Sequence, residues 1–315
     1  MPIFYVVLGI ICLVFLVAYI KLDTFISFVI VSIGLGFACG MDVKSINTSL
    51  VNGIGNTIGP LIIIIGFGAM LGKLVADSGA AQRITSVLIK LFGEKYLPWG
   101  LALAGFVIGL PLFYNAGFVI VIPLIFSIAA STRLPMLYVA IPMLSALSVA
   151  HGYLPPHPSP TVLATQFKAD IGLTLTYGII VAIPAIIIAG PLFAQTLKKY
   201  NPQPDPVLYK VKVFTDEEMP SLFTSLMIAL MPLLLLTLSA PIKAVFKDNA
   251  IIFNFLDFIG DASISMLISV LAAIYFLGIK RGNKMTTVMK QLEEAFKSVS
   301  IILLIIAGAG CFKQI

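Results

Sequence analysis

Charge is scarce in this chain of 315 residues: Asp, Glu, Lys and Arg together make up 11% of it, and histidine occurs only twice. Soluble domains carry about 25% charged residues, so a soluble globular protein is excluded. The cysteines, Cys12, Cys39 and Cys311, show neither CxxC nor metal-ligand spacing. The net charge of +6 comes without a basic patch interleaved with aromatic residues, so no nucleic-acid partner is expected.

Sequence motifs of hydrolytic and nucleotide-driven chemistry are missing as well. No HExxH, GxSxG or Walker loop occurs. His151 and His157 stand six residues apart, unlike the i, i+4 pair of a helical zinc site, and no carboxylate lies between them. An intramembrane hydrolase is therefore disfavoured, an ATP-driven pump is excluded within these residues, and we expect no metal, no cofactor and no catalytic residue.

Long hydrophobic stretches dominate what is present. Hydrophobic residues make up 59% of the chain, and the mean hydropathy is +1.07. A helix needs about 20 apolar residues to cross a bilayer, and nine stretches suit a polytopic bundle: 3–20, 24–40, 60–75, 98–114, 116–130, 136–150, 171–197, 221–240 and 262–279. The first lacks a basic leader and a cleavage site, so we interpret it as a retained span. We predict an all-α polytopic integral membrane protein.

The distribution of Lys and Arg predicts its orientation, because positive loops stay in the cytoplasm. If the N-terminus is outside and each stretch crosses once, 14 Lys and Arg residues fall in cytoplasmic loops and four fall outside. Seven crossings then precede the polar loop 198–220, which is predicted to be cytoplasmic, and 243–249 is predicted to be outside.

A repeat recurs at an offset of 242 residues. Gly40 aligns with Gly282, and the GxG at 66–68 aligns with the GxG at 308–310. In both copies a span ends at the glycine, and the segment after it has apolar residues at every fourth position, which predicts an amphipathic interfacial helix. An apolar run that ends in GxG follows this segment. Seven crossings turn the second copy upside down, which predicts the inverted-topology repeats of secondary transporters.

This repeat divides the chain into three parts. They are a first inverted repeat over 1–200, a cytoplasmic linker loop over 201–220, and the start of a second repeat over 221–315. We expect broken or re-entrant helices in them. The first copy continues well beyond its GxG, so the second repeat is expected to be incomplete, and a complete one would bring the protein to roughly 440 residues.

Both histidines lie at the end of the stretch 136–160, in a segment rich in proline. Proline breaks helices, so 154–160 is predicted to be non-helical. Broken backbone persists in a membrane only where protein buries it or where it lines a wet cavity, and an intramembrane histidine faces the interior. We predict a substrate site containing His151, Pro155, Pro156, His157, Ser159 and Thr161. The alternative is a surface loop stiffened by proline.

Two roles are assigned within this segment. His157 is the candidate for a coupling proton, because imidazole titrates near neutral pH. Thr161 is placed to cap a helix over 162–168.

A second interruption lies at 111–117, where proline, an amide and glycine separate two spans. We predict a discontinuous helix or tight hairpin whose backbone N–H groups, together with Tyr114, Asn115 and Gly117, face an anionic substrate. An ordinary helix–helix turn is the alternative.

Two further pairs of residues have more than one interpretation. Gly66 and Gly68 indicate either close helix packing or an unwound segment that exposes carbonyls, and the sequence does not separate these. Asp77 and Ser78 fit a helix N-cap and a substrate-binding role equally well.

With these motifs in place, the chain resembles the gluconate permease family of sugar-acid:proton symporters. The resemblance runs along essentially the whole chain and is carried by GFGAMLGKLVADSGAAQRI (66–84), LPLFYNAGFVIVIP (110–123), HGYLPPHPSPT (151–161) and GAGCFKQI (308–315). It implies a secondary transporter of the bacterial inner membrane, related to the wider superfamily of inverted-repeat ion transporters. The implied substrates are small hydroxylated monocarboxylates such as gluconate, each taken up together with a proton. The protein itself would lie in the lipid bilayer, and the resemblance leaves open whether it forms a homo-oligomer.

The resemblance places His157 with Pro155 and Pro156, and Asn115 with Gly117, on the motifs expected near the substrate. Two positions depart from the family pattern, which has Glu or Asp at Asn115 and Gly at Ser159. An amide cannot titrate, which leaves three possibilities for coupling: a proton on His157, a proton on a carboxylate beyond Ile315, or a different coupling. Two alternatives remain: a carrier of another small carboxylate such as D-serine or glycerate, and a truncated, non-transporting remnant or interaction protein.

Overall fold

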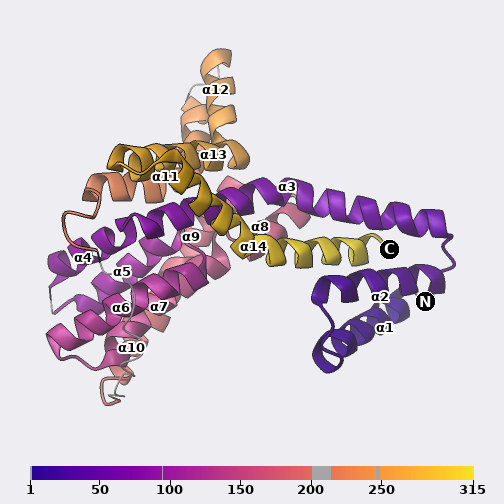
Figure 1. The fold of residues 1–315 in the computed structure, drawn as a ribbon, viewed down its shortest axis with the longest axis horizontal. Helices are drawn as coiled ribbons and strands as arrows, with labels where there is room; N and C mark the ends of the chain where they lie inside the picture. The colour runs from indigo at the N-terminus through magenta and orange to yellow at the C-terminus, as the bar shows by residue number, and fades with distance from the viewer. Residues whose placement is uncertain (1, 94, 201–213, 246–248) are drawn as a thin grey trace. The chain divides into compact units, whose positions relative to one another are not determined.

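The computed structural model of the chain describes residues 2–93, 95–200, 214–245 and 249–315, and over these residues it is all-helical (Figure 1). Among the described residues, six helical stretches are long and apolar enough to cross a membrane: Val43–Asp77, Met136–Gln166, Ile171–Thr196, Leu222–Ser239, Ala262–Arg281 and Met285–Gln314. This confirms the prediction of an all-α polytopic membrane protein.

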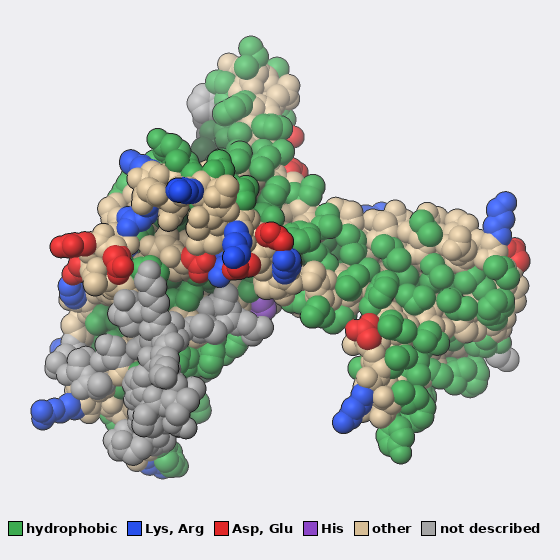
Figure 2. Space-filling view, in the orientation of Figure 1, with side chains coloured by type: hydrophobic (Ala, Val, Ile, Leu, Met, Phe, Trp, Pro, Cys, Tyr) green, Lys and Arg blue, Asp and Glu red, His purple; other side chains and the backbone are tan. Residues whose placement is uncertain are grey.

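The surface has the composition expected of helices that lie in lipid. Hydrophobic side chains cover much of the face shown in Figure 2, and charged side chains occupy only a few places on it. Many large apolar side chains are more than half exposed, among them Phe4, Tyr177 and Ile251. In water such extensive apolar exposure would promote association, whereas in a bilayer the same side chains are solvated by acyl chains.

The contacts divide the chain into two compact units, Met1–Ile63 with Lys297–Ile315 and Ile64–Phe296. The first unit contains α1 (Pro2–Val14), a π-helical turn (Phe15–Tyr19), α2 (Thr24–Ala38), and parts of α3 (Val43–Asp77) and α14 (Met285–Gln314). Gly53 of α3 and Gly310 of α14 lie so close that a Cβ atom on either would collide with the carbonyl oxygen of the other. These two helices therefore touch backbone to backbone in this unit.

The continuity of α3 and α14 corrects one prediction. A separate interfacial helix was expected after Gly40 and after Gly282, but the backbone is helical without interruption from Val43 to Asp77 and from Met285 to Gln314. Pro60 lies inside α3. The prediction was wrong because the proline removes a single main-chain hydrogen bond, and the aliphatic residues around it continue the helix.

The helix starts repeat at the offset found in the sequence. α14 begins at Met285, 242 residues after α3 begins at Val43. The glycines before them share a left-handed backbone, with φ of +79° at Gly40 and +84° at Gly282. Glycine adopts this conformation without the strain that a Cβ atom brings, and it is a common way to end a helix. The preceding helices therefore end alike in both copies.

The second unit contains the remaining helices. In chain order they are α4 (Ala80–Phe92), α5 (Leu97–Gly109), α6 (Tyr114–Thr132), α7 (Met136–Tyr153), α8 (Pro158–Gln166), α9 (Ile171–Ile187), α10 (Phe193–Thr196), α11 (Leu222–Val245), α12 (Ala250–Gly260) and α13 (Ala262–Ala273). π-helical turns at Ile188–Leu192 and Ile274–Gly278 extend α9 and α13, and a short 3₁₀ turn follows at Ile279–Arg281.

The core of the second unit forms around α5 and α7. Leu101, Ile108, Met143 and Leu147 are completely buried there. A Cβ atom on Gly105 would collide with the Met143 carbonyl oxygen, so the two helices approach each other at backbone distance. This close contact fixes the C-terminal ends of α5 and α7 relative to each other, and both interruptions predicted from the sequence begin at these ends.

The end of the predicted linker is held against the start of α4. Gln82 donates through Nε2 to the Phe214 carbonyl oxygen (2.8 Å), and its Oε1 accepts the Phe214 N–H (2.9 Å). Arg83 pairs with the Asp216 carboxylate at 3.0 Å. Residues 201–213 of the predicted 201–220 linker lie outside the described residues. Its last part is therefore an ordered segment attached to the first half of the chain.

Candidate functional site

Two interruptions between helices form the centre of the candidate site. The first, 110–113, separates α5 from α6, and the second, 154–157, separates α7 from α8. The second confirms the predicted break but is shorter than 154–160. Pro158 and Pro160 belong to the first turn of α8, where a proline is tolerated because its missing N–H has no intrahelical acceptor there.

The two histidines join these interruptions. His157 Nε2 lies 2.8 Å from the carbonyl oxygen of Gly109, and its Nδ1 lies 3.1 Å from Nδ1 of His151. The Tyr114 N–H, in the first turn of α6, donates to the same His151 Nδ1 at 3.3 Å. His157 is only 2% exposed, whereas His151 is half-buried. The imidazole pair thus connects the end of α5, the start of α6 and the break after α7.

Aromatic rings complete the surroundings of the pair. The Phe113 ring presents an edge-on contact to both imidazoles, with centroid distances of 5.9 Å to His151 and 5.6 Å to His157. The Tyr114 ring is tilted against His151 at 6.4 Å. Among the described residues, neither histidine makes a hydrogen bond or ion pair with a carboxylate. The site is therefore rich in hydrogen-bonding groups and carries no negative charge that would oppose an anion.

One face of α3 supports both interruptions. A Cβ atom on Gly68 would lie 3.5 Å from Pro156 Cγ, and one on Gly72 would lie 2.6 Å from the Pro111 carbonyl oxygen. α3 is regular helix through Gly66 and Gly68, so the unwound alternative is wrong and the packing alternative holds. The sequence reasoning missed Gly72, although its spacing of four from Gly68 is the small-residue pattern of close helix contacts.

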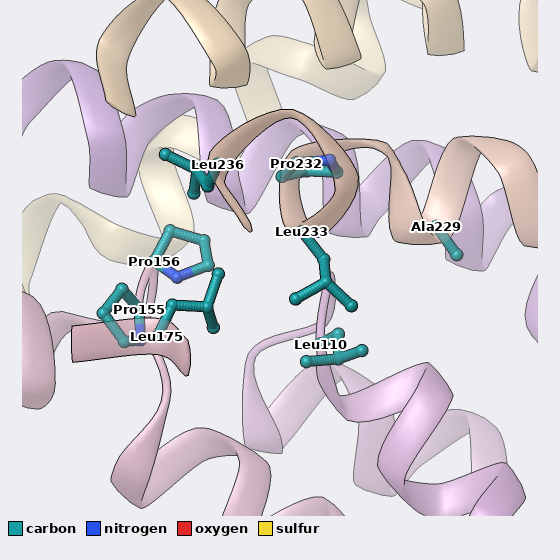
Figure 3. Close-up of a pocket in the computed structure, with 8 residues that line it drawn as sticks. All are labelled: Leu110, Pro155, Pro156, Leu175, Ala229, Pro232, Leu233 and Leu236. Atoms are coloured by element: carbon teal, nitrogen blue, oxygen red, sulfur yellow. The ribbon is translucent and has the colours of Figure 1, made fainter. Parts of the chain in front are cut away.

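The two interruptions also face α11. Figure 3 shows the space they enclose, lined by Leu110, Pro155, Pro156, Leu175, Ala229, Pro232, Leu233 and Leu236. This cavity measures about 10 Å³, roughly the room that one water needs. A sugar acid does not fit in a cavity of this size. A groove of about 530 Å³ between α1 and α2 is lined by hydrocarbon side chains, glycine and one cysteine, and offers no partner for hydroxyl groups.

Four other residues of the predicted site belong to the same two segments of the chain. Thr161 is buried, and its hydroxyl donates to the His157 carbonyl oxygen (2.7 Å) from within α8. The predicted cap of a helix over 162–168 is therefore wrong, because α8 already begins at Pro158 with His157 as its N-cap residue. Ser159 is exposed, and Gly117 is buried against Leu147. The Asn115 side chain lies outside the described residues.

Asp77 and Ser78 are not brought to the histidines. Asp77 ends α3, about 13 Å along the helix axis from Gly68. It pairs with Lys73 (3.1 Å) and accepts a hydrogen bond from Gln291 of α14 (3.1 Å). The Ser78 hydroxyl donates to the Val75 carbonyl oxygen and accepts the Ala80 N–H. These contacts link α3 to α14 and to the start of α4.

Comparison with known proteins gives a consistent result over the whole chain. Residues 1–315 match the GntP family permeases. The chain is 44% identical over 315 residues to the high-affinity gluconate transporter and 42% identical to the Gnt-II system L-idonate transporter, both of Escherichia coli (strain K12). It is 43% identical over 326 residues to the gluconate permease of Bacillus subtilis (strain 168). Each match covers 100% of this chain and 72% of the relative.

Proposed function

The chain belongs to the GntP family of permeases, and from that premise we propose that it takes up gluconate or a similar small sugar acid by proton symport. It is a multi-pass transporter of the bacterial inner membrane and not an enzyme. The observation that carries the proposal is the pair of imidazoles buried between two helix interruptions, with no carboxylate in contact with either ring among the described residues.

The chemistry of this pair suits an anionic, hydroxylated substrate. Gluconate and L-idonate, the substrates in the relatives' names, are both polyhydroxylated monocarboxylates. Imidazole donates or accepts hydrogen bonds according to its protonation state, and the first turn of α6, next to His151, carries the positive end of a helix dipole. Another small carboxylate, such as D-serine or glycerate, fits the same charge requirement and is an outcome of the test below.

Proton coupling is assigned to His157. It lies buried at a helix break, and imidazole is the side chain whose ordinary titration falls near neutral pH. Asn115, at the position where the family pattern has a carboxylate, cannot take this role because an amide does not titrate.

We also propose that the 242-residue repeat is inverted, with copies beginning in 1–200 and in 221–315. The matched starts of α3 and α14 support it, as does the Lys and Arg bias.

Uptake of labelled acids by cells that lack other gluconate carriers tests the proposal. Cells making the intact protein should accumulate gluconate, with less or no accumulation of D-serine and glycerate, and a proton ionophore should abolish accumulation. His157→Ala should abolish uptake at normal membrane abundance, whereas Leu163→Ala, at an exposed position of α8, should not. Preference for D-serine or glycerate would replace the substrate assignment. Absence of any uptake by a correctly inserted protein would support a non-transporting remnant.

A further inference from the structure

The contacts of the histidine pair fix the number of protons that it holds. A carbonyl oxygen only accepts, so the 2.8 Å contact with Gly109 requires a proton on His157 Nε2. The 3.1 Å contact between the two Nδ1 atoms requires one proton between them, because two lone pairs or two N–H groups would repel. The Tyr114 N–H at 3.3 Å requires a lone pair on His151 Nδ1.

A neutral pair cannot satisfy all three contacts. If His151 Nδ1 carries the shared proton, it donates to His157 and offers the Tyr114 N–H no lone pair. If His151 carries its proton on Nε2 instead, the two Nδ1 lone pairs face each other. All three contacts are satisfied together only when His157 is protonated on both nitrogens and His151 accepts on Nδ1. The observed arrangement therefore fits one proton more than the neutral pair holds.

We infer that His151 and His157 act as one proton-carrying unit, in which His151 is the entry point and the carboxylate contact while His157 stores the charge. A proton adds to the Nε2 lone pair of His151, and the Nδ1 proton of His151 moves to Nδ1 of His157. One N–H bond forms at each ring and one breaks at His151, so the pair gains a single positive charge. His151 Nε2–H then donates to the carboxylate of the substrate.

Burial supports this order of events. His151 is the half-buried member, and its Nε2 takes part in none of the contacts described, so we assign it as the nitrogen that solvent and substrate reach. His157 is 2% exposed and is reached through His151. Of the groups that contact the pair from α5, α6 and α7, Tyr114 has the only other titratable side chain among the described residues.

Charge then couples the proton to the anion. A buried cation without a counter-ion is unfavourable, so the pair holds the extra proton less tightly when no anion is bound, and a carboxylate at His151 Nε2–H strengthens its hold on that proton. The coupling is reciprocal: the proton and the anion each raise the affinity of the pair for the other by the same factor. Substrate affinity must therefore fall as the pH rises through the titration of the pair. The inference rests on the proposed function and adds a stoichiometry of one proton per carboxylate.

Calorimetry on the purified intact protein tests this inference. Gluconate binding is measured in buffers of different ionisation enthalpy, which gives the number of protons taken up per gluconate bound. At pH values above the range in which the histidine pair titrates, we expect the wild type and Leu163→Ala to take up about one proton per gluconate bound. His151→Gln and His157→Gln should each bind gluconate with no proton uptake and with little dependence on pH. In ¹⁵N-histidine NMR, gluconate should bring an imidazolium signal that His157→Gln removes.

The outcomes separate this inference from the proposed function. Gluconate binding by the wild type without proton uptake would overturn the inference and leave gluconate transport intact. Retained proton uptake in both glutamine variants would also overturn it, because the proton would then reside elsewhere. An imidazolium signal lost in His151→Gln but retained in His157→Gln would reverse the assigned roles. Absence of gluconate binding and uptake by the wild type would remove the proposed function, and this inference with it.

Discussion

Gly72 of α3 lies directly against the carbonyl group of Pro111. A Cβ atom on Gly72 would be 2.6 Å from the Pro111 oxygen and 3.3 Å from the Leu112 Cα. The neighbours are backbone atoms at the end of α5, which cannot rotate away as a flexible side chain can. The interruption between α5 and α6, and with it the Tyr114 N–H, is therefore positioned by a glycine that the sequence does not mark as part of the site.

Gly72→Ala is expected to destabilise the protein and to reduce uptake. Overpacking of this kind typically costs about 1–3 kcal/mol, and the strain falls on the backbone next to His151. Thermal unfolding in detergent and gluconate uptake measure the two effects. Gly55→Ala is the control, because this glycine of the same helix has nothing within 4 Å of an added Cβ, and alanine there should be neutral or stabilising. Equal stability of the two variants would contradict the close contact.

Gln82→Glu is expected to loosen the end of the linker. The carboxylate can still accept the Phe214 N–H but can no longer donate to the Phe214 carbonyl oxygen, so one of the two hydrogen bonds in this partly buried contact is lost. Such a loss costs on the order of 1–3 kcal/mol. Hydrogen exchange of residues 214–220 should accelerate by about tenfold or more, whereas Glu217→Gln, an exposed change in the same segment, should leave it unaltered. Unchanged exchange in Gln82→Glu would refute a role of Gln82 in holding the linker.

The topology predicted from Lys and Arg can be tested with two introduced cysteines. The native Cys12, Cys39 and Cys311 are first replaced by serine. The positive-inside rule places 198–220 in the cytoplasm and 243–249 outside, and Glu217 and Asn249 are exposed positions in these segments. Applied to intact cells, an impermeant thiol reagent should label Asn249→Cys and spare Glu217→Cys. Labelling of Glu217→Cys alone would reverse the orientation.

Asp42, which precedes α3, is expected to titrate abnormally. Hydrogen bonds from the Ser45 N–H (2.8 Å) and the Ser45 hydroxyl (3.1 Å) lower the pKa of its carboxyl below the ordinary 3.8. Because the folded pKa is depressed, the cap stabilises the helix start above pH 3.8 and is lost as the pH falls through the lower folded value. Ser45→Ala should raise the Asp42 pKa part of the way back in a carboxyl NMR titration. An unaltered titration would mean that the hydroxyl contact is absent in solution.

The sequence predicted the helix break, because local chemistry determines structure there. Two successive prolines remove two successive backbone donors and disfavour helix in the residue before them, so the break at Pro155 and Pro156 followed from the sequence alone, as did the burial of His157 beside it. The same local rule failed at Pro60, where a single proline within a long aliphatic helix was too weak to divide α3.

The partners of the histidines were not predictable in the same way. Gly109 accepts a hydrogen bond from His157, 48 residues further along the chain, and this pairing depends on how α5 packs against α7. Glycines spaced by four, Gly105 with Gly109 and Gly68 with Gly72, lie where helices approach closely in the structure. Their spacing does not tell which helix each one meets, so the supporting shell of the site required the structure.

The apolar lining of the small cavity beside Pro155 and Pro156 has a bioenergetic consequence. A carrier driven by a proton gradient must not let protons cross the membrane without substrate. Protons cross membranes along chains of water molecules, so an empty carrier must not contain such a chain. Leucine, proline and alanine line the space between these prolines and α11, so such a chain would have no polar side chain there to hold it. For the proton symporter proposed above, this apolar contact would act as electrical insulation, so that the membrane keeps its charge between one transport cycle and the next.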